Sequence, residues 1–225
     1  MSTTVISIAN AKGGVGKSTV SILLAGCFSK LLQKKVLILD TDSQNSVTRW
    51  FESEKRIYDS DPLVTVESLM PQHVQMYLKK FGDDFDIVFI DVPRMTHGVG
   101  ESATLQLLYY CDSVLIPVVG SRMDVDSTAN FFKVVMEAKA KKIEMGFPFE
   151  VFGFLNKESN RKDHQEAKEV LKRAGIDMLE STLRDLKIFT TPSLFECILD
   201  TKEGKRRFEP FYNEVTKKLK IRKNG

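Results

Sequence analysis

The sequence predicts an α/β fold with a doubly wound, mostly parallel β-sheet and helices on both of its faces. Short continuous apolar runs alternate along the chain with longer stretches in which apolar residues recur every three or four positions. This alternation is typical of parallel strands that helices cover on both sides. A glycine-rich stretch also separates the first apolar run from the first amphipathic one, at the strand-to-helix turn where such folds bind ligands.

Length and composition indicate an ordinary globular protein. A chain of 225 residues is long enough for one large core, so we expect residues 1–225 to form a single domain. No apolar run approaches the roughly 18 residues of a membrane-spanning helix, and the N-terminus lacks a signal-peptide pattern, which predicts a cytoplasmic protein without a transmembrane segment. The three cysteines are widely spaced in apolar surroundings, so we expect buried free thiols.

The glycine-rich stretch follows an expected strand at 5–9 and precedes an expected helix at 20–32. Its glycines let the backbone curl with N–H groups pointing inward, and the following helix adds the positive end of its dipole, so the loop is suited to phosphate. Lys17 would reach the β- and γ-phosphates, and the Ser18 hydroxyl is placed to bind Mg²⁺. We therefore predict a nucleoside triphosphate site, against the alternative of a glycine-rich turn with incidental lysines.

One detail of the loop makes the prediction more specific. The general pattern has a glycine five residues before Gly16, where this chain has Ala11, and a second lysine, Lys12, stands before the first two glycines. The segment KGGVGKST resembles the deviant Walker A motif of the ParA/MinD family of P-loop ATPases. The resemblance implies a P-loop NTPase fold, ATP and Mg²⁺ as cofactors, and an ATP-dependent homodimer in which Lys12 reaches the partner's nucleotide.

Two carboxylates follow the expected strand at 36–39. Ligands of doubly wound sheets lie at the carboxyl ends of strands, so Asp40 and Asp42 should face the phosphate loop rather than only cap a turn. The family has D-x-D-P-Q here, and Ser43 replaces the proline, which predicts a less rigid loop. The resemblance implies that Asp40 helps to organise the Mg²⁺ shell and that Asp42 positions the attacking water.

A further buried strand, 85–91, ends in Asp91 and has the form of a Walker B element. Asp91 would hold Mg²⁺ through water, because this ion gives up its hydration reluctantly. Arg94 lies where the resemblance places a second switch segment, and it either contacts phosphate or a partner or is simply solvated. The predicted metal ligands are thus Ser18, Asp40 and Asp91, and the predicted catalytic residues are Lys12, Lys17 and Asp42.

The other elements follow from the same periodicities, although residues 47–81 are weakly informative. The expected strands are 63–66, 113–119 and 151–155, and the expected helices are 72–81, 101–110, one capped by Asp124 or Asp126, and 163–174. In the family an asparagine near Asn156 can lie by the adenine. By resemblance, the predicted nucleotide contacts are Lys12, Gly13, Gly14, Val15, Gly16, Lys17, Ser18, Thr19, Asn156 and Pro192.

The last part of the chain resembles the chromosome and plasmid partition branch of the family. Arg184 and Lys187 fall at its R-x-x-R positions, Thr191-Pro192-Ser193 stands for A-P-S, and a basic turn ends in Gly204. From Lys202 onward the chain has nine basic and three acidic residues, which indicates an anionic partner. The predicted surface for sequence-independent DNA binding, with a solvated charged face as the alternative, is Arg184, Lys187, Lys202, Lys205, Arg206 and Arg207.

The resemblance is to the small ParA-type partition ATPases, which lack an N-terminal operator-binding domain, because this chain enters its first strand by residue 5. It implies a centromere-binding, ParB-type partner that stimulates hydrolysis, and nucleoid association with ATP bound. The alternative is a MinD-like, membrane-associated ATPase. Its anchor would be an exposed amphipathic helix, whereas we expect the apolar stripe at 208–219 to pack on the sheet. ATP is favoured over GTP because Asn156-Lys157-Glu158-Ser159 lacks the aspartate of an Asn-Lys-x-Asp motif.

Overall fold

The computed structural model describes residues 3–93, 99–119, 122–158 and 163–223. Six strands form one sheet in the order β3-β2-β4-β1-β5-β6, and every pair is parallel. They are β1 (Thr4–Ile8), β2 (Val36–Asp40), β3 (Thr65–Ser68), β4 (Ile87–Asp91), β5 (Ser113–Val118) and β6 (Glu150–Leu155). The predicted α/β fold is confirmed. Arg94 and the side chains of Asp124 and Asp126 lie outside the described residues.

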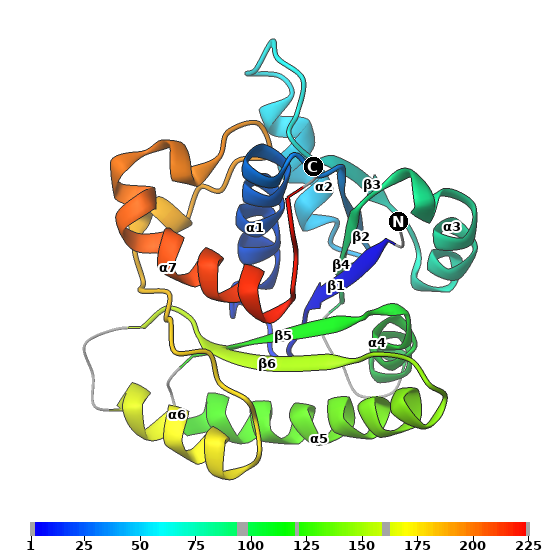
Figure 1. Ribbon diagram of the computed structural model, residues 1–225, viewed down its shortest axis with the longest axis vertical. Helices are drawn as coiled ribbons and strands as arrows, with labels where there is room; N and C mark the ends of the chain where they lie inside the picture. Colours follow the sequence, from blue (N-terminus) through cyan, green and yellow to red (C-terminus); the bar gives the residue numbers. More distant parts are fainter. Residues whose placement is uncertain (1–2, 94–98, 120–121, 159–162, 224–225) are drawn as a thin grey trace.

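Helices cover both faces of the sheet (Figure 1). One apolar core includes residues of α1 (Lys17–Leu32), α2 (Ser46–Glu54) and α7 (Lys202–Lys218). The second core, on the opposite face, includes residues of α3 (Val74–Phe81), α4 (Val99–Tyr110), α5 (Arg122–Glu144) and α6 (Asp163–Arg173). Strands between two apolar layers need apolar side chains on both faces, which is why the sequences of β2 and β4 are continuous apolar runs.

The largest differences from the predicted elements lie in residues 47–81. The edge strand β3 is shifted two residues toward the C-terminus, and only one of its four residues is even partly buried. The nine-residue helix α2 was not predicted, because only one short apolar face, with Val47 buried and Trp50 and Phe51 partly buried, marks it. Short edge elements leave weak patterns because most of their side chains face solvent.

The C-terminal helix α7 carries the apolar stripe as expected. Phe208, Phe211, Tyr212 and Val215 are buried against the sheet, and Leu219 packs on the same core. The three cysteines are free and buried, which confirms the prediction for them. In the described ranges, no helix combines the length and the apolar character that crossing a membrane requires.

Candidate nucleotide-binding site

The phosphate loop joins β1 to α1 at the carboxyl edge of the sheet. Gly14 and Gly16 have φ angles of 75° and 93°, in the left-handed region that favours glycine. Helix α1 begins at Lys17, directly after Gly16, so its first N–H groups and its positive dipole end open onto the loop. The backbone conformation therefore supports the anion-binding site that the sequence predicts.

A cavity of about 280 Å³ lies over this loop. Lys17 and Ser18 of the loop line it, together with Asp42, Val92 and Lys157 from other segments. Lys17 is buried, with only 7% of the residue exposed. Its Nζ donates a hydrogen bond to the carbonyl of Lys12 at 3.3 Å. Lys12 itself is an exposed residue. The two predicted loop lysines thus occupy different positions, one within the cavity and one on the surface.

The three predicted metal ligands come together beside this cavity. Asp40 and Asp91 are register partners at the ends of β2 and β4. Ser18 Oγ donates to Asp91 Oδ2 at 2.7 Å, and Thr48 donates to Asp40 Oδ2 from both its N–H and its Oγ1 at 2.9 Å. Among the described residues, the other oxygen of each carboxylate, Oδ1, is buried without a hydrogen-bond partner.

This donor set fits Mg²⁺. Two unpartnered carboxylate oxygens and a hydroxyl are hard oxygen ligands, and buried acceptors without partners are costly unless a cation or water satisfies them. No cluster of three or more His, Cys, Asp or Glu side chains suited to a metal occurs in the described ranges. A site with few protein ligands agrees with an ion that keeps several waters and binds phosphate oxygens.

Burial raises the pKa of Asp91 to about 7, a shift that the Ser18 hydrogen bond opposes and nearby Asp40 increases. Between about pH 4 and pH 7, Asp91 is therefore protonated in the nucleotide-free native state but ionised in the unfolded chain. Stability contributed by this group is present below the unfolded pKa of about 4 and is lost as the pH rises to about 7, by at most about 1.4 kcal/mol per pH unit.

Asp91→Asn should remove this part of the pH dependence. In EDTA without nucleotide, the melting temperature of the wild type is expected to fall relative to Asp91→Asn between about pH 4.5 and pH 7, because the amide replaces a carboxyl that must ionise in the core. Thermal unfolding of both proteins across this range measures the difference. Parallel curves for the two proteins would contradict the raised pKa of Asp91.

Asp42 lies at the rim of the same cavity. Its Oδ1 accepts from the N–H of Gln44 at 2.9 Å, and its carbonyl accepts from the N–H of Asn45 at 2.8 Å. The turn before α2 therefore fixes the carboxylate while it remains half-buried. Its position fits the predicted role in orienting a water, and Ser43, which replaces the family's proline, is exposed in this turn.

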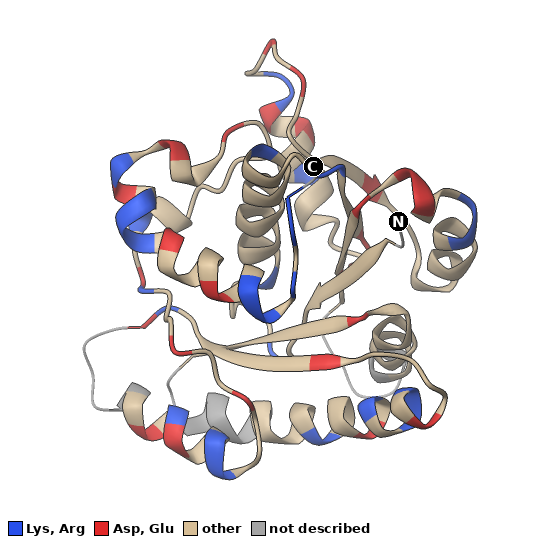
Figure 2. Cartoon of the chain, in the orientation of Figure 1, with Lys and Arg blue, Asp and Glu red and all other residues tan. Residues whose placement is uncertain are grey.

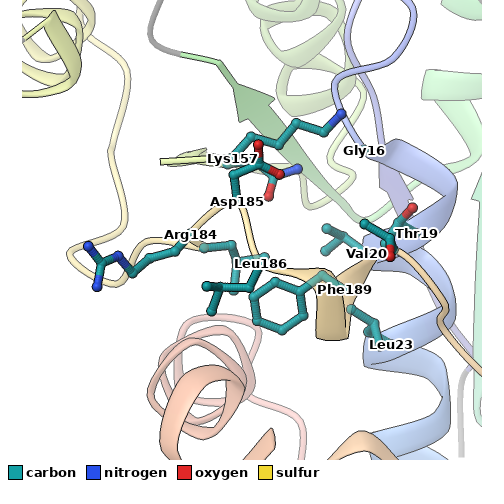
Figure 3. A pocket seen from close by; sticks show the side chains of 12 residues that line it. Gly16, Thr19, Val20, Leu23, Lys157, Arg184, Asp185, Leu186 and Phe189 are labelled. Atoms are coloured by element: carbon teal, nitrogen blue, oxygen red, sulfur yellow. The ribbon is translucent and has the colours of Figure 1, made fainter. Parts of the chain in front are cut away.

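A second cavity, of about 160 Å³, adjoins the loop and has apolar and polar walls suited to a nucleoside (Figure 3). Val20, Leu23 and Phe189 supply apolar surface, and Asp185 and Asn156 supply polar groups. Its full lining is Gly16, Thr19, Val20, Leu23, Asn156, Lys157, Leu183, Arg184, Asp185, Leu186, Phe189 and Thr190. The two cavities share Gly16, Thr19 and Lys157.

The two nucleotide contacts predicted outside the loop occupy different places. Asn156 lines the second cavity, and its Nδ2 donates to the carbonyl of Val15 at 2.7 Å. Pro192 is buried and lines neither cavity, and its carbonyl accepts from Trp50 Nε1 at 2.7 Å. The structure therefore brings Asn156 to the loop and leaves Pro192 apart from both cavities.

A family model, described as the CobQ/CobB/MinD/ParA nucleotide binding domain, matches residues 6–209. The chain belongs to this family. The match includes the phosphate loop and the strands that carry the two carboxylates, and the resemblance to ParA/MinD ATPases is confirmed.

The curated relatives of this chain carry names that refer to different cellular processes. The chain is 24% identical over 187 residues to maintenance of carboxysome distribution protein A of Halothiobacillus neapolitanus, covering 82% of this chain and 81% of that protein. It is 29% identical over 150 residues to sporulation initiation inhibitor protein Soj of Bacillus subtilis, covering 51% of this chain and 57% of Soj.

Several solved structures share the fold of this chain. A Cyanothece McdA–ATP complex has a TM-score of 0.76 at 16% identity, with 99% of this chain and 98% of that chain covered. A putative plasmid partition protein of Borrelia burgdorferi bound to AMPPNP has a TM-score of 0.70 at 21% identity, with 97% and 100% covered. Cobyrinic acid a,c-diamide synthase of Mycobacterium smegmatis, with an ATP analogue and magnesium, has a TM-score of 0.72 at 18% identity, with 98% and 97% covered.

Two contacts at the site were not predicted from the sequence. Thr48, on α2, fixes Asp40, and Lys157, after β6, donates from Nζ to the carbonyl of Gly14 at 2.8 Å. A threonine eight residues after an aspartate gives no recognisable spacing. Lys157 could have been predicted to lie near the site, because a residue at the carboxyl end of a parallel strand lies at the ligand-binding edge of the sheet.

The predicted DNA-binding residues lie on two neighbouring stretches of sequence. Arg184 and Lys187 belong to the segment between α6 and α7, in which Lys187 begins a short 3-10 helix, Lys187–Phe189. Figure 3 shows the Arg184 side chain pointing away from the phosphate loop. The other four lie in the first two turns of α7, where Lys and Arg gather in Figure 2. Glu203 lies among them and forms ion pairs of 2.8 Å with Arg206 and 3.0 Å with Arg207.

Proposed function

We propose that the protein is a ParA-type ATPase that hydrolyses Mg·ATP, dimerises when ATP is bound, and uses this cycle to position a cargo along DNA. One observation carries the nucleotide part of the proposal. The unpartnered oxygens of Asp40 and Asp91 lie beside a glycine loop whose cavity already contains a buried lysine. Anion donors and hard cation ligands at one strand edge suit a metal-bound triphosphate.

The chain's own residues then have distinct tasks. The loop N–H groups and Lys17 would bind the phosphates, and Ser18, Asp40 and Asp91 would hold Mg²⁺, which supplies charge neutralisation on the phosphate oxygens. Asp42 would accept a hydrogen bond from the attacking water and orient it toward the terminal phosphate. The exposed position of Lys12 on the phosphate loop supports a role toward a second subunit, because an exposed side chain is accessible to a partner.

The names of the relatives do not agree on one cargo. Their names refer to carboxysome distribution, sporulation and chromosome partitioning. We infer that a separate adaptor, of the ParB type in the partition systems, identifies the cargo and stimulates hydrolysis here. The MinD-like alternative finds no support in α7, because its apolar stripe is buried in the core rather than available to a membrane.

DNA binding is the part of the proposal that the basic surface supports. Non-specific binding arises when lysines and arginines neutralise phosphates and release counterions, so log affinity should fall with log salt by roughly 0.9 per contact. A dimer presents two copies of the surface, so ATP should strengthen binding without any base-reading element. The pairing of Glu203 with Arg206 and Arg207 reduces the local positive charge but holds both guanidinium groups near the helix start.

The test is a charge-reversal variant, Arg184→Glu/Lys205→Glu/Arg206→Glu, in a mobility shift on random-sequence duplex with ATP or ADP. We expect at least about a 100-fold loss of ATP-dependent affinity and a shallower salt slope, because six phosphate contacts would disappear from a dimer. The matched control reverses three lysines elsewhere, Lys79→Glu/Lys133→Glu/Lys141→Glu. If the first variant still dimerises and binds like the control, the surface is only a solvated face.

A further inference from the structure

Two consecutive residues after β6 hold two consecutive carbonyls of the phosphate loop. Asn156 Nδ2 donates to the carbonyl of Val15 at 2.7 Å, and Lys157 Nζ donates to that of Gly14 at 2.8 Å. Figure 3 shows the Lys157 side chain extended toward the loop near Gly16. The end of β6 and the phosphate loop are therefore joined by one neutral and one charged hydrogen bond.

These bonds fix the direction of the loop's N–H groups. A trans peptide unit is planar, so its carbonyl and the N–H of the following residue point in opposite directions; the described chain has no cis peptide bonds. Because the Gly14 carbonyl is held toward Lys157, the N–H of Val15 points the opposite way, and because the Val15 carbonyl is held toward Asn156, the N–H of Gly16 points away from Asn156. A glycine loop binds phosphate through N–H groups whose directions are fixed in this way.

The backbone of Lys157 supports a functional use of its side chain. Its φ angle is 54°, in the left-handed region, which disfavours residues other than Gly, Asn and Asp. An observed backbone outlier beside a ligand site is grounds for a functional hypothesis. Lys157 is also one of three residues that line both cavities.

The packing around Asn156 leaves it little freedom. A Cβ on Gly16 would collide with Asn156 Nδ2, so the loop can approach the asparagine only because residue 16 is a glycine. Asn156 is buried, whereas Lys157 is exposed and reaches the loop by its long stem. Removing the Lys157 ammonium should therefore affect the loop without creating a cavity in the core.

We propose that Lys157 is a positioning residue for triphosphate binding, which acts with Asn156 to orient the phosphate-binding N–H groups of Val15 and Gly16 from within the same subunit. This inference rests on the proposed nucleotide-binding function and adds to it a third lysine, distinct from Lys12 and Lys17. The Lys157 ammonium group would also add positive potential beside the phosphates of a bound nucleotide. Its contribution is to binding, and the reacting groups remain those already named.

The test compares Lys157→Met, which keeps the length of the side chain and removes the charge, with Lys157→Arg. We expect Lys157→Met to weaken binding of a fluorescent, non-hydrolysable ATP analogue by about 10-fold or more, because hydrogen bonds to charged groups are individually strong. Lys157→Arg should recover most of that affinity. In steady-state ATPase assays the loss should appear in KM, with kcat at saturation within about two-fold of wild type, since uniform binding is removed.

Two controls separate positioning from general damage. Lys141→Met removes an exposed lysine near the end of α5 and should leave the affinity unchanged. Lys157→Gly relieves the left-handed backbone, so its melting temperature should equal or exceed that of wild type while its affinity still falls. If wild type and Lys157→Met bind the analogue equally well, the role proposed for Lys157 is wrong but the proposed nucleotide-binding function still stands. A wild type that binds no nucleotide would instead refute the proposed function.

Discussion

Lys17→Ala is expected to abolish ATP binding. The side chain is almost fully buried and reaches across the loop to the Lys12 carbonyl, inside the cavity that would receive the phosphates. Truncating one partner of a buried, hydrogen-bonded charge pair costs about 2–5 kcal/mol, which predicts a loss of affinity of at least about 30-fold and up to several thousand-fold. Isothermal titration with a non-hydrolysable analogue and Mg²⁺ measures it.

Lys12→Ala is the matched control, because it removes a lysine from the same loop but from an exposed position. This variant should bind ATP as a monomer with nearly normal affinity, yet dimerise poorly and hydrolyse ATP slowly if Lys12 acts on the partner's nucleotide. Light scattering with the analogue reports the dimer. Normal ATP affinity in Lys17→Ala would refute the site, whereas an unchanged dimer and turnover in Lys12→Ala would show only that Lys12 is an exposed bystander.

The sequence predicted the centre of the fold better than its edge, for a physical reason. Strands such as β2 and β4 are buried on both faces, so burial requires nearly every residue to be apolar and leaves an unmistakable run. At the edge, β3 has one partner strand and mostly exposed side chains. Helix α2 packs through one short face, and its length of nine residues gives periodicity little room to show.

The same contrast applies to the site. Ser18, Asp40 and Asp91 could be predicted together because the carboxyl ends of parallel strands must meet at one edge, whatever the loops do. Pro192 was predicted from an order of motifs alone; its carbonyl accepts a hydrogen bond from Trp50 of α2, and its role as a nucleotide contact stays a prediction. Contacts such as Lys157 to Gly14 depend on loop conformation between residues 143 positions apart, which local sequence patterns do not encode.

Asp42→Asn should retain Mg·ATP binding but slow hydrolysis by at least about 100-fold. A carboxylate that orients water acts mainly in the transition state, so its loss should lower kcat much more than it changes affinity. Asparagine keeps an oxygen that can accept from the N–H of Gln44, so the turn that holds residue 42 is preserved and only the charge is removed. With hydrolysis blocked, ATP should hold the protein as a long-lived dimer.

Single-turnover hydrolysis and light scattering on the same sample distinguish the possible roles of Asp42. Ser43→Ala, which alters the adjacent exposed residue of the turn, should hydrolyse ATP normally and return to monomer as ATP is consumed. Asp42→Asn should remain dimeric over the same period. If Asp42→Asn instead turns over at the wild-type rate, its carboxylate serves only the turn. Another group at the cavity must then orient the water, because the carboxylates of Asp40 and Asp91 are held by Thr48 and Ser18 and are proposed to bind Mg²⁺ through their other oxygens.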